Sequence, residues 1–256
     1  MSNLFDLSSK VAVVTGASSG LGVQMALVLA RQGAKVALLA RRLEKLNTVK
    51  QQLEQETGTE ALAIKCDVTK EDQIQAAAKK IVENWGKIDI LVNNAGVSGM
   101  GSSEELPAAD WQKVIDVNLT GVFLCAKNFG KYMVEQKYGK IINTASIFGQ
   151  VGNTAFPVAA YHASKGGVIN LTRALAAEWA KYNITVNAIG PGFFESEMTA
   201  AIKQDEQANN FGKAGNPMHR WGKAGELDGA VVLLASDASS YITGQTIFVD
   251  GGWTAI

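Results

Sequence analysis

The 256 residues suffice for one large domain of alternating strands and helices, and no linker-like stretch divides residues 1–256 into two. Hydrophobic residues make up 47% of the chain and charged residues 19%, which supplies a large core and excludes an intrinsically disordered protein. Lys and Arg together number 24, as do Asp and Glu, so the formal net charge is zero and nothing draws the whole molecule to nucleic acid or to an anionic membrane.

The two cysteines, Cys66 and Cys125, have neither paired spacing nor a nearby His suited to metal binding. We therefore expect two reduced, buried thiols, no disulfide and no metal site, as is usual in a cytoplasmic protein. The first ten residues lack a basic stretch followed by an apolar one, and no run of 18 uncharged apolar residues follows. Neither export nor a membrane span is expected, and the predicted location is the cytoplasm.

Short apolar runs alternate with helix-periodic segments along the first part of the chain. The β-branched run Val11–Val14 suits a strand that is buried on both faces. After it, the expected elements are a helix at 21–31, a strand at 35–40, a helix at 43–56 and a strand at 61–66. A repeated strand–helix–strand order requires a parallel sheet with right-handed crossovers.

The same alternation continues towards the C-terminus. The expected helices are 71–85, 111–136, 161–181 and 227–234, and the expected strands are 88–92, 140–144, 185–188 and 246–249. Seven strands with helices between them predict an α/β, doubly wound, single-domain fold. Residues 195–225 break this rhythm, because they are polar, carry several glycines and are long for a connection. We expect either a substrate lid or a mobile surface loop there.

A glycine-rich turn joins the first strand to the first helix, with the sequence Thr15-Gly16-Ala17-Ser18-Ser19-Gly20-Leu21-Gly22. Glycines permit a positive φ and a close backbone approach, and the N–H groups at a helix N-terminus favour an anion. The spacing is a variant of the dinucleotide-binding fingerprint, although a tight turn alone also uses glycines. We predict that a dinucleotide pyrophosphate binds at Gly16, Ser18, Ser19, Gly20, Leu21 and Gly22.

The end of the second strand predicts which nicotinamide nucleotide binds. An acidic residue there would hold the ribose 2′-OH of NAD, whereas an arginine accommodates the 2′-phosphate of NADP. Here Arg41 and Arg42 follow the strand, and no carboxylate occurs before Glu44. Guanidinium groups offer forked donors suited to a phosphate, so we predict that NADP(H) is preferred and NAD(H) is possible. The alternative is that both arginines are solvated residues at the start of a helix.

Tyr161 and Lys165 stand four residues apart at the start of a helix-periodic segment. On a helix, the phenol and the ammonium lie on one face, one turn apart. A cation within about 4–6 Å favours the phenolate, so the pair can transfer a proton near neutral pH. Taken alone, such pairs also occur on solvated helix faces.

Further motifs accompany these features in a fixed order. They are Cys66-Asp67-Val68-Thr69, Asn93-Asn94-Ala95-Gly96, Val117-Asn118-Leu119, Ser146 and Pro191-Gly192. With them, the chain from Lys10 onwards resembles the short-chain dehydrogenase/reductase family, which has a Rossmann-type fold with a seven-stranded parallel sheet. The resemblance implies that Asp67 and Val68 lie at the adenine, that Asn94, Ala95 and Gly96 close the cofactor cleft, and that Pro191, Gly192 and Ser196 lie beside the nicotinamide.

The same resemblance implies a mechanism. Tyr161 is the general acid in reduction and the general base in oxidation, and Lys165 lowers its pKa and hydrogen-bonds the nicotinamide ribose. Ser146 donates a hydrogen bond to the carbonyl oxygen as negative charge develops there. Asn118 holds a water that links Lys165 to solvent. The hydride belongs to the cofactor.

Two departures from the family pattern concern the borders of the site. Between Ser146 and Tyr161 the chain is two residues longer than is common, around Asn153–Val158, and a bulged loop is expected there. Ser196 stands where the family usually has a threonine that contacts the nicotinamide, so the hydroxyl is retained. His162 follows the tyrosine on a different helix face and is expected to pack or lie at the surface.

The residues expected to face the substrate are largely apolar or aromatic: Ser146, Phe148, Phe156, Val158, Phe193, Phe194 and Met198. The nearest cations are Lys203, His219 and Arg220, in the expected lid. This set favours an apolar or aromatic ketone and its secondary alcohol over a free sugar acid. The aromatic residues could instead complete the core or a subunit interface.

Other functions stay open. Similarity to 3-oxoacyl-thioester reductases and to gluconate 5-dehydrogenase-like members of the family keeps acyl thioesters and sugar acids as alternative substrates. A non-catalytic nucleotide-sensing protein could share the fold. Members of the family are commonly tetramers, and the helices expected at 111–136 and 161–181 could form such an interface or simply cover the sheet.

Overall fold

A parallel sheet forms the centre of the molecule, and the computed structural model describes residues 3–256. Its seven strands are β1 (Val11–Thr15), β2 (Lys35–Ala40), β3 (Ala61–Lys65), β4 (Ile90–Asn93), β5 (Gly139–Thr144), β6 (Ile184–Pro191) and β7 (Thr246–Val249). They are ordered β3-β2-β1-β4-β5-β6-β7, and every neighbouring pair is parallel. The order reverses between β1 and β4, which confirms the predicted doubly wound fold.

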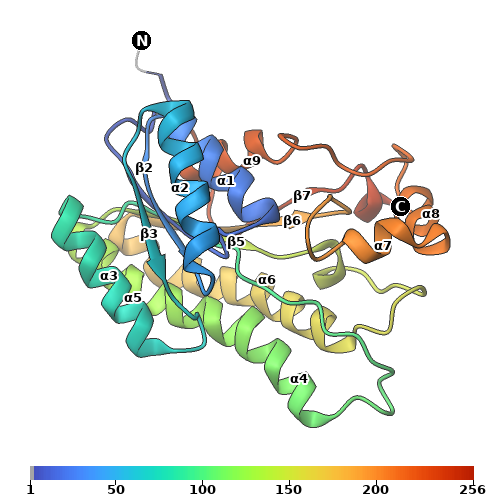
Figure 1. Cartoon of the computed structure of the whole chain (residues 1–256). Coiled ribbons are helices and arrows are strands. Elements are labelled where there is room, and N and C mark those ends of the chain that lie inside the picture. Colours follow the sequence, from blue (N-terminus) through green and yellow to red (C-terminus); the bar gives the residue numbers. More distant parts are fainter. Residues whose placement is uncertain (1–2) are drawn as a thin grey trace.

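Helices cover both faces of the sheet (Figure 1). One layer holds α1 (Gly20–Arg31), α2 (Leu43–Thr57) and α9 (Asp228–Ala235). The opposite layer holds α3 (Glu71–Trp85), α4 (Ala108–Ile115), α5 (Gly121–Gln136) and α6 (Ala159–Trp179). Two short helices, α7 (Ala200–Gln204) and α8 (Glu206–Ala214), lie in the connection after β6.

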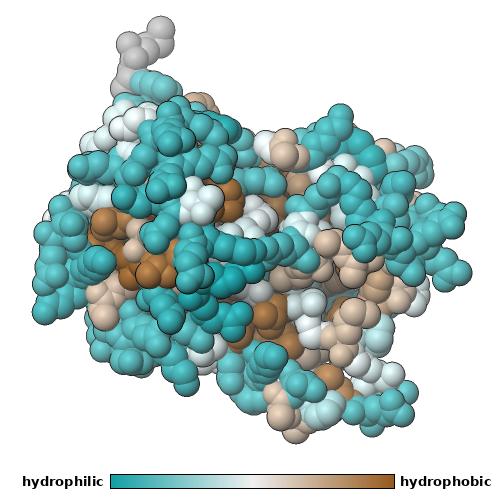
Figure 2. Space-filling model, in the orientation of Figure 1, coloured by the Kyte–Doolittle hydropathy of each residue, from teal (hydrophilic) through white to brown (hydrophobic). Residues whose placement is uncertain are grey.

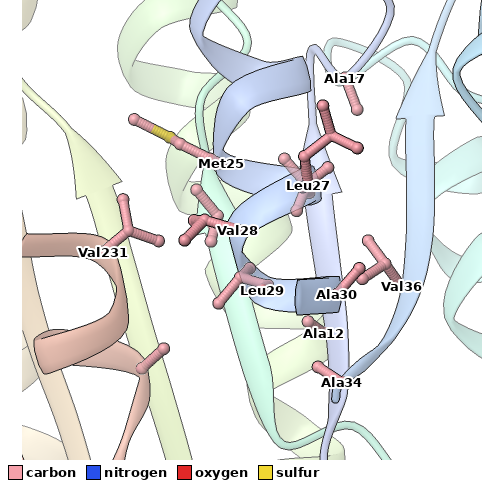
Figure 3. Packing of buried hydrophobic residues seen from close by; sticks show 14 of the residues in the cluster. Ala12, Ala17, Met25, Leu27, Val28, Leu29, Ala30, Ala34, Val36 and Val231 are labelled. Carbon is pink, nitrogen blue, oxygen red and sulfur yellow. The ribbon is translucent and has the colours of Figure 1, made fainter. Parts of the chain in front are cut away.

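The core has two layers because successive side chains of a strand point to opposite faces. Ala12 and Val14 of β1 belong to the cluster beneath α1 and α9, whereas Val11 and Val13 belong to the cluster on the α3 and α5 side. In Figure 3, Met25, Val28 and Leu29 of α1 lie toward Val231 of α9, and Ala30 faces Val36 of β2. The continuous apolar runs in the sequence therefore reflect strands that are buried on both faces.

Most predicted elements form within a few residues of their expected bounds, with one informative exception. The helix expected at 111–136 is divided into α4 and α5 by a π-helical turn, η1 (Asp116–Thr120). Asn118 lies in this turn and is fully buried. A π turn inserts one extra residue into a helix and is often found at functional sites.

The polar connection at 195–225 is more ordered than its composition indicates. It contains α7 and α8, and Asp205 starts α8 by accepting a hydrogen bond from the backbone N–H of Ala208 at 2.8 Å. Phe194 and Gly222 form an isolated parallel bridge across its base. The segment is therefore a partly helical connection whose two ends are held together by this bridge.

The face seen in Figure 2 is mostly hydrophilic, with patches of apolar residues between hydrophilic ones. Within residues 3–256, none of the helices combines the length and the apolar character that crossing a bilayer requires.

We expect the burial of α2 on the sheet to control stability through Leu46, which is 0% exposed. Leu46→Ala should lower the free energy of unfolding by about 2–5 kcal/mol, because it removes buried methyl groups and leaves a cavity. Leu43, on the same helix, is 40% exposed, and Leu43→Ala should cost less than about 1 kcal/mol. Urea unfolding of both variants at one protein concentration measures the difference. Equal losses would show that this helix does not pack as described.

Candidate active site

A cleft of about 550 Å³ opens at the carboxyl ends of the strands, at the point where the strand order reverses. Most of the predicted site residues line it: Gly16, Ser18, Ser19, Gly20, Leu21, Arg41, Arg42, Asp67, Val68, Asn94, Ala95, Gly96, Ser146, Tyr161, Lys165, Pro191, Gly192, Phe194, Ser196 and Met198. They come together because the ends of parallel strands meet at one edge of the sheet.

The glycine turn is held against the loop that follows β4. Asn94 Nδ2 donates to the carbonyl of Thr15 at 3.1 Å, and Thr15 Oγ1 accepts from the backbone N–H groups of Asn94 and Ala95 at 3.0 and 3.1 Å. Gly16 has a φ of +66°, and a Cβ there would lie 2.8 Å from the Cα of Ala95. The turn can therefore take this shape only with glycine.

Gly22 lies behind the cleft and acts through packing. A Cβ on this residue would come within 2.4 Å of the carbonyl oxygen of Gly16. Helix α1 begins at Gly20, and its first turn carries no acidic side chain. Its N-terminal N–H groups and dipole therefore point at the space where an anion is expected. No carboxylate in the first turn of the helix competes for them.

Asp67 follows β3 at the far end of the cleft. Its Oδ1 accepts hydrogen bonds from the backbone N–H and the hydroxyl of Thr69, at 3.0 and 2.8 Å. Burial raises the pKa of Asp67, but these hydrogen bonds and the nearby Arg41 outweigh it, so the pKa lies below the ordinary value. The carboxylate is thus charged and fixed in position.

Arg42 lies at the centre of a polar cluster that the sequence did not reveal. Its Nη2 donates to Ser18 Oγ at 3.2 Å, to Ser19 Oγ at 3.0 Å and to Glu197 Oε2 at 2.8 Å. Lys45 Nζ donates to the other oxygen of the same carboxylate at 2.5 Å. Hydrogen bonds from Arg42, Lys45 and Ser19, in that order, lower the pKa of Glu197 to about 2. Glu197 and Lys45 have no motif in the sequence that predicts this role.

Lys165 is buried beneath Tyr161. Its Nζ donates to the backbone carbonyl of Thr144 at 2.6 Å and lies 5.6 Å from the centroid of the Tyr161 ring. Burial lowers the pKa of Lys165 to about 8, because a charged ammonium loses its hydration there. The two residues share one helix face, as their spacing predicts.

The pKa of Tyr161 shifts in the direction opposite to the one expected. Burial raises the pKa of the phenol, and a hydrogen bond with Ser146 opposes this shift only in part. In this structure the pKa of the phenol is therefore raised, against the lowering expected from Lys165. The physical reason is that the ammonium points to the Thr144 carbonyl and itself holds its proton weakly, while desolvation penalises the phenolate.

Asn118 lies behind Lys165, outside the cleft lining. Its Oδ1 accepts from the backbone N–H of Val97 at 2.8 Å, and its Nδ2 donates to the Val97 carbonyl at 2.8 Å and to Ser164 Oγ at 3.1 Å. A Cβ at Gly96 would lie 3.3 Å from Asn118 Oδ1 and 3.8 Å from Lys165 Nζ. The side chain thus joins the loop after β4 to the π turn and to α6, and the expected water at Asn118 stays a prediction.

The expected substrate residues divide into two groups. Ser146, Phe194 and Met198 line the cleft, and Phe194 also packs in the core. Phe148, Phe156 and Phe193 lie elsewhere, in an aromatic cluster with Phe211, Trp221 and Trp253. Val158 is buried at the start of α6. The aromatic residues pack on one another at ring distances of 5.3–6.3 Å, and contact of these four positions with the substrate stays a prediction.

The longer loop before Tyr161 is folded around Asn153. Its Oδ1 accepts from the backbone N–H groups of Ala155 and Phe156 at 3.0 and 2.7 Å, and its Nδ2 lies 3.2 Å from Nε2 of His162. His162 also stacks on Phe148, with ring centroids 4.8 Å apart. His162 therefore packs, as expected, and Tyr161 keeps its place at the cleft.

Two cations of the connection at 195–225 that were expected near the substrate are engaged in ion pairs. Lys203 pairs with Glu195, and Arg220 makes a two-pronged pair with Glu226 at 2.7 and 2.8 Å. Arg220 Nη1 also donates to the carbonyl of Trp221 at 3.0 Å. Both ion pairs therefore stabilise the segment at 195–225. Across residues 3–256, no group of three His, Cys, Asp or Glu side chains is arranged to hold a metal ion.

Comparison with known proteins agrees with this geometry. A family model described as enoyl-(acyl carrier protein) reductase matches residues 16–254. The 2-dehydro-3-deoxy-D-gluconate 5-dehydrogenase of Formosa agariphila is 41% identical over 252 residues, which are 98% of this chain and 94% of that protein.

Two solved structures show the same fold throughout. A short-chain type dehydrogenase/reductase from Mycobacterium marinum has 39% identity and a TM-score of 0.95, with 99% of this chain and 98% of that chain covered. A gluconate 5-dehydrogenase from Burkholderia cenocepacia, solved in complex with NADP and tartrate, has 37% identity and a TM-score of 0.94, with 99% and 98% covered. This chain therefore belongs to the short-chain dehydrogenase/reductase family of oxidoreductases.

Proposed function

We propose that this protein is an NADP(H)-dependent oxidoreductase that interconverts a ketone and a secondary alcohol, with Tyr161 as the general acid and base. One observation carries the proposal: the cleft holds Ser146, Tyr161 and Lys165 at one end and the glycine turn with Arg42 at the other. A proton-transfer group and a site for a phosphate-bearing nucleotide thus share one cavity.

The residues present fit a nicotinamide nucleotide. The glycine turn allows backbone approach at Gly16, and the N-terminus of α1 favours a pyrophosphate. Arg42 with Ser18 and Ser19 offers donors for a ribose 2′-phosphate, and Asp67 is fixed at the far end for the adenosine. Lys165 and Tyr161 border the end assigned to the nicotinamide. When bound, the nucleotide supplies the hydride.

The chain itself moves the proton. Ser146 Oγ accepts from the backbone N–H of Phe148 at 3.2 Å, which leaves its hydroxyl hydrogen to be directed at a substrate oxygen or at the phenol. Tyr161 carries its proton at neutral pH because burial raises its pKa. The phenol is therefore in the protonated form that a general acid needs for reduction. Lys165, with a pKa of about 8, is poised to exchange a proton near neutrality.

The substrate class that the cleft favours is an uncharged ketone. Its substrate end offers Phe194, Met198 and the Ser146 hydroxyl. Lys165 at this end is hydrogen-bonded to the Thr144 carbonyl, and Lys203 and Arg220 are held by carboxylates. The names of the relatives favour a second candidate, a sugar acid such as a keto-gluconate. For that substrate, Lys203 or Arg220 would have to leave its partner. The description of the family model keeps an acyl thioester as a third.

The remaining proposals concern assembly and location. Residues 195–225, with α7 and α8, are suited to act as a substrate lid on the single catalytic domain, because Ser196, Glu197 and Met198 at their start line the cleft. Exposed apolar side chains on α4 and α5, Trp111 and Phe123, support a homotetramer. Cys66 and Cys125 are free, and burial raises the pKa of Cys66 to about 11, as suits unreactive thiols in the cytoplasm.

Replacing Tyr161 with Phe tests the proposed reaction. The ring keeps its packing but loses the proton, so Tyr161→Phe should lower kcat by about 10²–10⁴-fold with the affinity for NADPH nearly unchanged. The matched control is Tyr241→Phe, at a fully exposed tyrosine, which should match the parent in both. Steady-state rates and nucleotide titration measure the two effects. A Tyr161→Phe enzyme with activity within tenfold of the parent would mean that another group carries the proton.

The pH dependence should differ between the two directions. Because burial raises the pKa of Tyr161, reduction should stay level near neutrality and fall as the pH rises through the pKa of the phenol. Oxidation needs the phenolate and should rise over the same interval. Profiles of kcat/KM in both directions measure this. Oxidation that stays level between about pH 6 and 10 would contradict the role of Tyr161 as the base.

A panel of carbonyl compounds separates the candidate substrates. With NADPH, we expect uncharged aromatic or aliphatic ketones to be reduced with a higher kcat/KM than keto-gluconates or 3-oxoacyl thioesters. The reason is that Lys203 and Arg220 are held in ion pairs, and Lys165 is hydrogen-bonded to the Thr144 carbonyl. Absorbance of the nucleotide gives the rates. A preference for the sugar acids would assign the second candidate, and no oxidation of NADPH with any compound would point to a non-catalytic nucleotide-binding protein.

A further inference from the structure

The segment that follows β6 reaches across the mouth of the cleft to the glycine turn. A Cβ at Gly20 would lie 3.0 Å from the Cβ of Ser196, so the two backbones are nearly in contact there. Figure 1 shows this segment, just before α7, beside the N-terminal end of α1. The next residue, Glu197, extends from this contact to Arg42 and Lys45. The Glu197 carboxylate, on one side of the cleft, therefore pairs with Arg42 and Lys45 on the other side.

Glu197 is bound by a cluster of cationic and hydroxyl side chains that is suited to bind an anion. Arg42 Nη2 bridges Ser18 Oγ, Ser19 Oγ and Glu197 Oε2, and Lys45 Nζ holds Glu197 Oε1. Two positive charges and the Ser19 hydroxyl thus contact one negative charge, and Ser18 Oγ accepts from Arg42 beside them. A phosphate dianion would match this cluster better than a single carboxylate, because it carries more charge and three acceptor oxygens.

We propose that Glu197 is a specificity-determining residue that occupies the 2′-phosphate site as an internal competitor, so that it weakens the binding of NADP(H) selectively relative to NAD(H). The inference rests on the proposed use of Arg42 to hold the 2′-phosphate. A nucleotide that carries this phosphate must displace the carboxylate from Arg42 and Lys45 or bind beside it against like-charge repulsion. A nucleotide with a 2′-hydroxyl leaves both ion pairs in place.

Glu197 is negatively charged, and so can compete with a phosphate for Arg42, at every ordinary assay pH. Hydrogen bonds from Arg42, Lys45 and Ser19 hold the pKa of Glu197 at about 2, so the carboxylate stays charged. The side chains of Arg42 and Glu197 are 46% and 52% exposed, and solvent therefore screens their attraction. A phosphate can therefore displace the carboxylate from Arg42.

The test uses two mononucleotides that differ only in the phosphate of interest, 2′,5′-ADP and 5′-AMP, titrated calorimetrically into the full-length protein. Glu197→Gln keeps the size of the side chain and removes its charge. It should tighten the binding of 2′,5′-ADP by roughly three- to thirtyfold and change the binding of 5′-AMP by less than about twofold. Glu195→Gln is the matched control, because this exposed glutamate two residues earlier pairs with Lys203, and both affinities should stay unchanged.

Arg42→Ala separates this inference from the cofactor proposal. If it abolishes the preference for 2′,5′-ADP while Glu197→Gln leaves that preference unaltered, Arg42 binds the phosphate and the competitor role of Glu197 is overturned. If Arg42→Ala has no effect on either mononucleotide, the assignment of the 2′-phosphate site itself fails, and the inference falls with it. Weaker binding of 5′-AMP by Glu197→Gln would show instead that Glu197 holds the 2′-hydroxyl, which also overturns the proposal.

Discussion

The burial of one ammonium group determines how the rest of the cleft is built. Lys165 is 3% exposed, and its Nζ has a backbone carbonyl, that of Thr144 at the end of β5, as its acceptor. A buried cation is costly unless it is hydrogen-bonded, so this contact holds the side chain of Lys165 against the end of β5. Gly149 reinforces it, because a Cβ there would lie 2.7 Å from the backbone carbonyl of Lys165. The loop after β5 can therefore approach the helix only without a side chain.

The π turn η1 also supports the region around Lys165, through Asn118. The extra residue of η1 turns Asn118 inward, where its amide bonds both backbone groups of Val97 as a neighbouring strand would. It also bonds Ser164, the residue before Lys165. The loop after β4 and helices α5 and α6 are thus joined at one side chain. A buried amide whose partners are this well matched makes the floor of the site rigid.

The order of strands and helices follows from the sequence because buried parallel strands read as continuous apolar runs, and the residues after them must gather at one edge. That is why Gly16, Arg42, Asn94 and Ser146 could be assigned to one cleft in advance. The aromatic residues could not be placed, because Phe193 packs on Trp253, whose approach depends on the closed fold. Nor could Glu197, whose partner Arg42 is 155 residues away. The direction of the Tyr161 pKa required the burial, which spacing does not contain.

The two ends of the cleft differ in how solvent acts on their charges. At the Arg42 end, the ion pairs are about half exposed, so salt screens them within a Debye length of about 8–10 Å. At the Lys165 end, the charged group is buried and dissolved ions have little access to it. The proposed selection between nucleotides at the Arg42 end is therefore open to small changes in side chain or ionic strength. The proposed proton transfer at the Lys165 end is less open to change, because any change there must first overcome the cost of moving a buried charge.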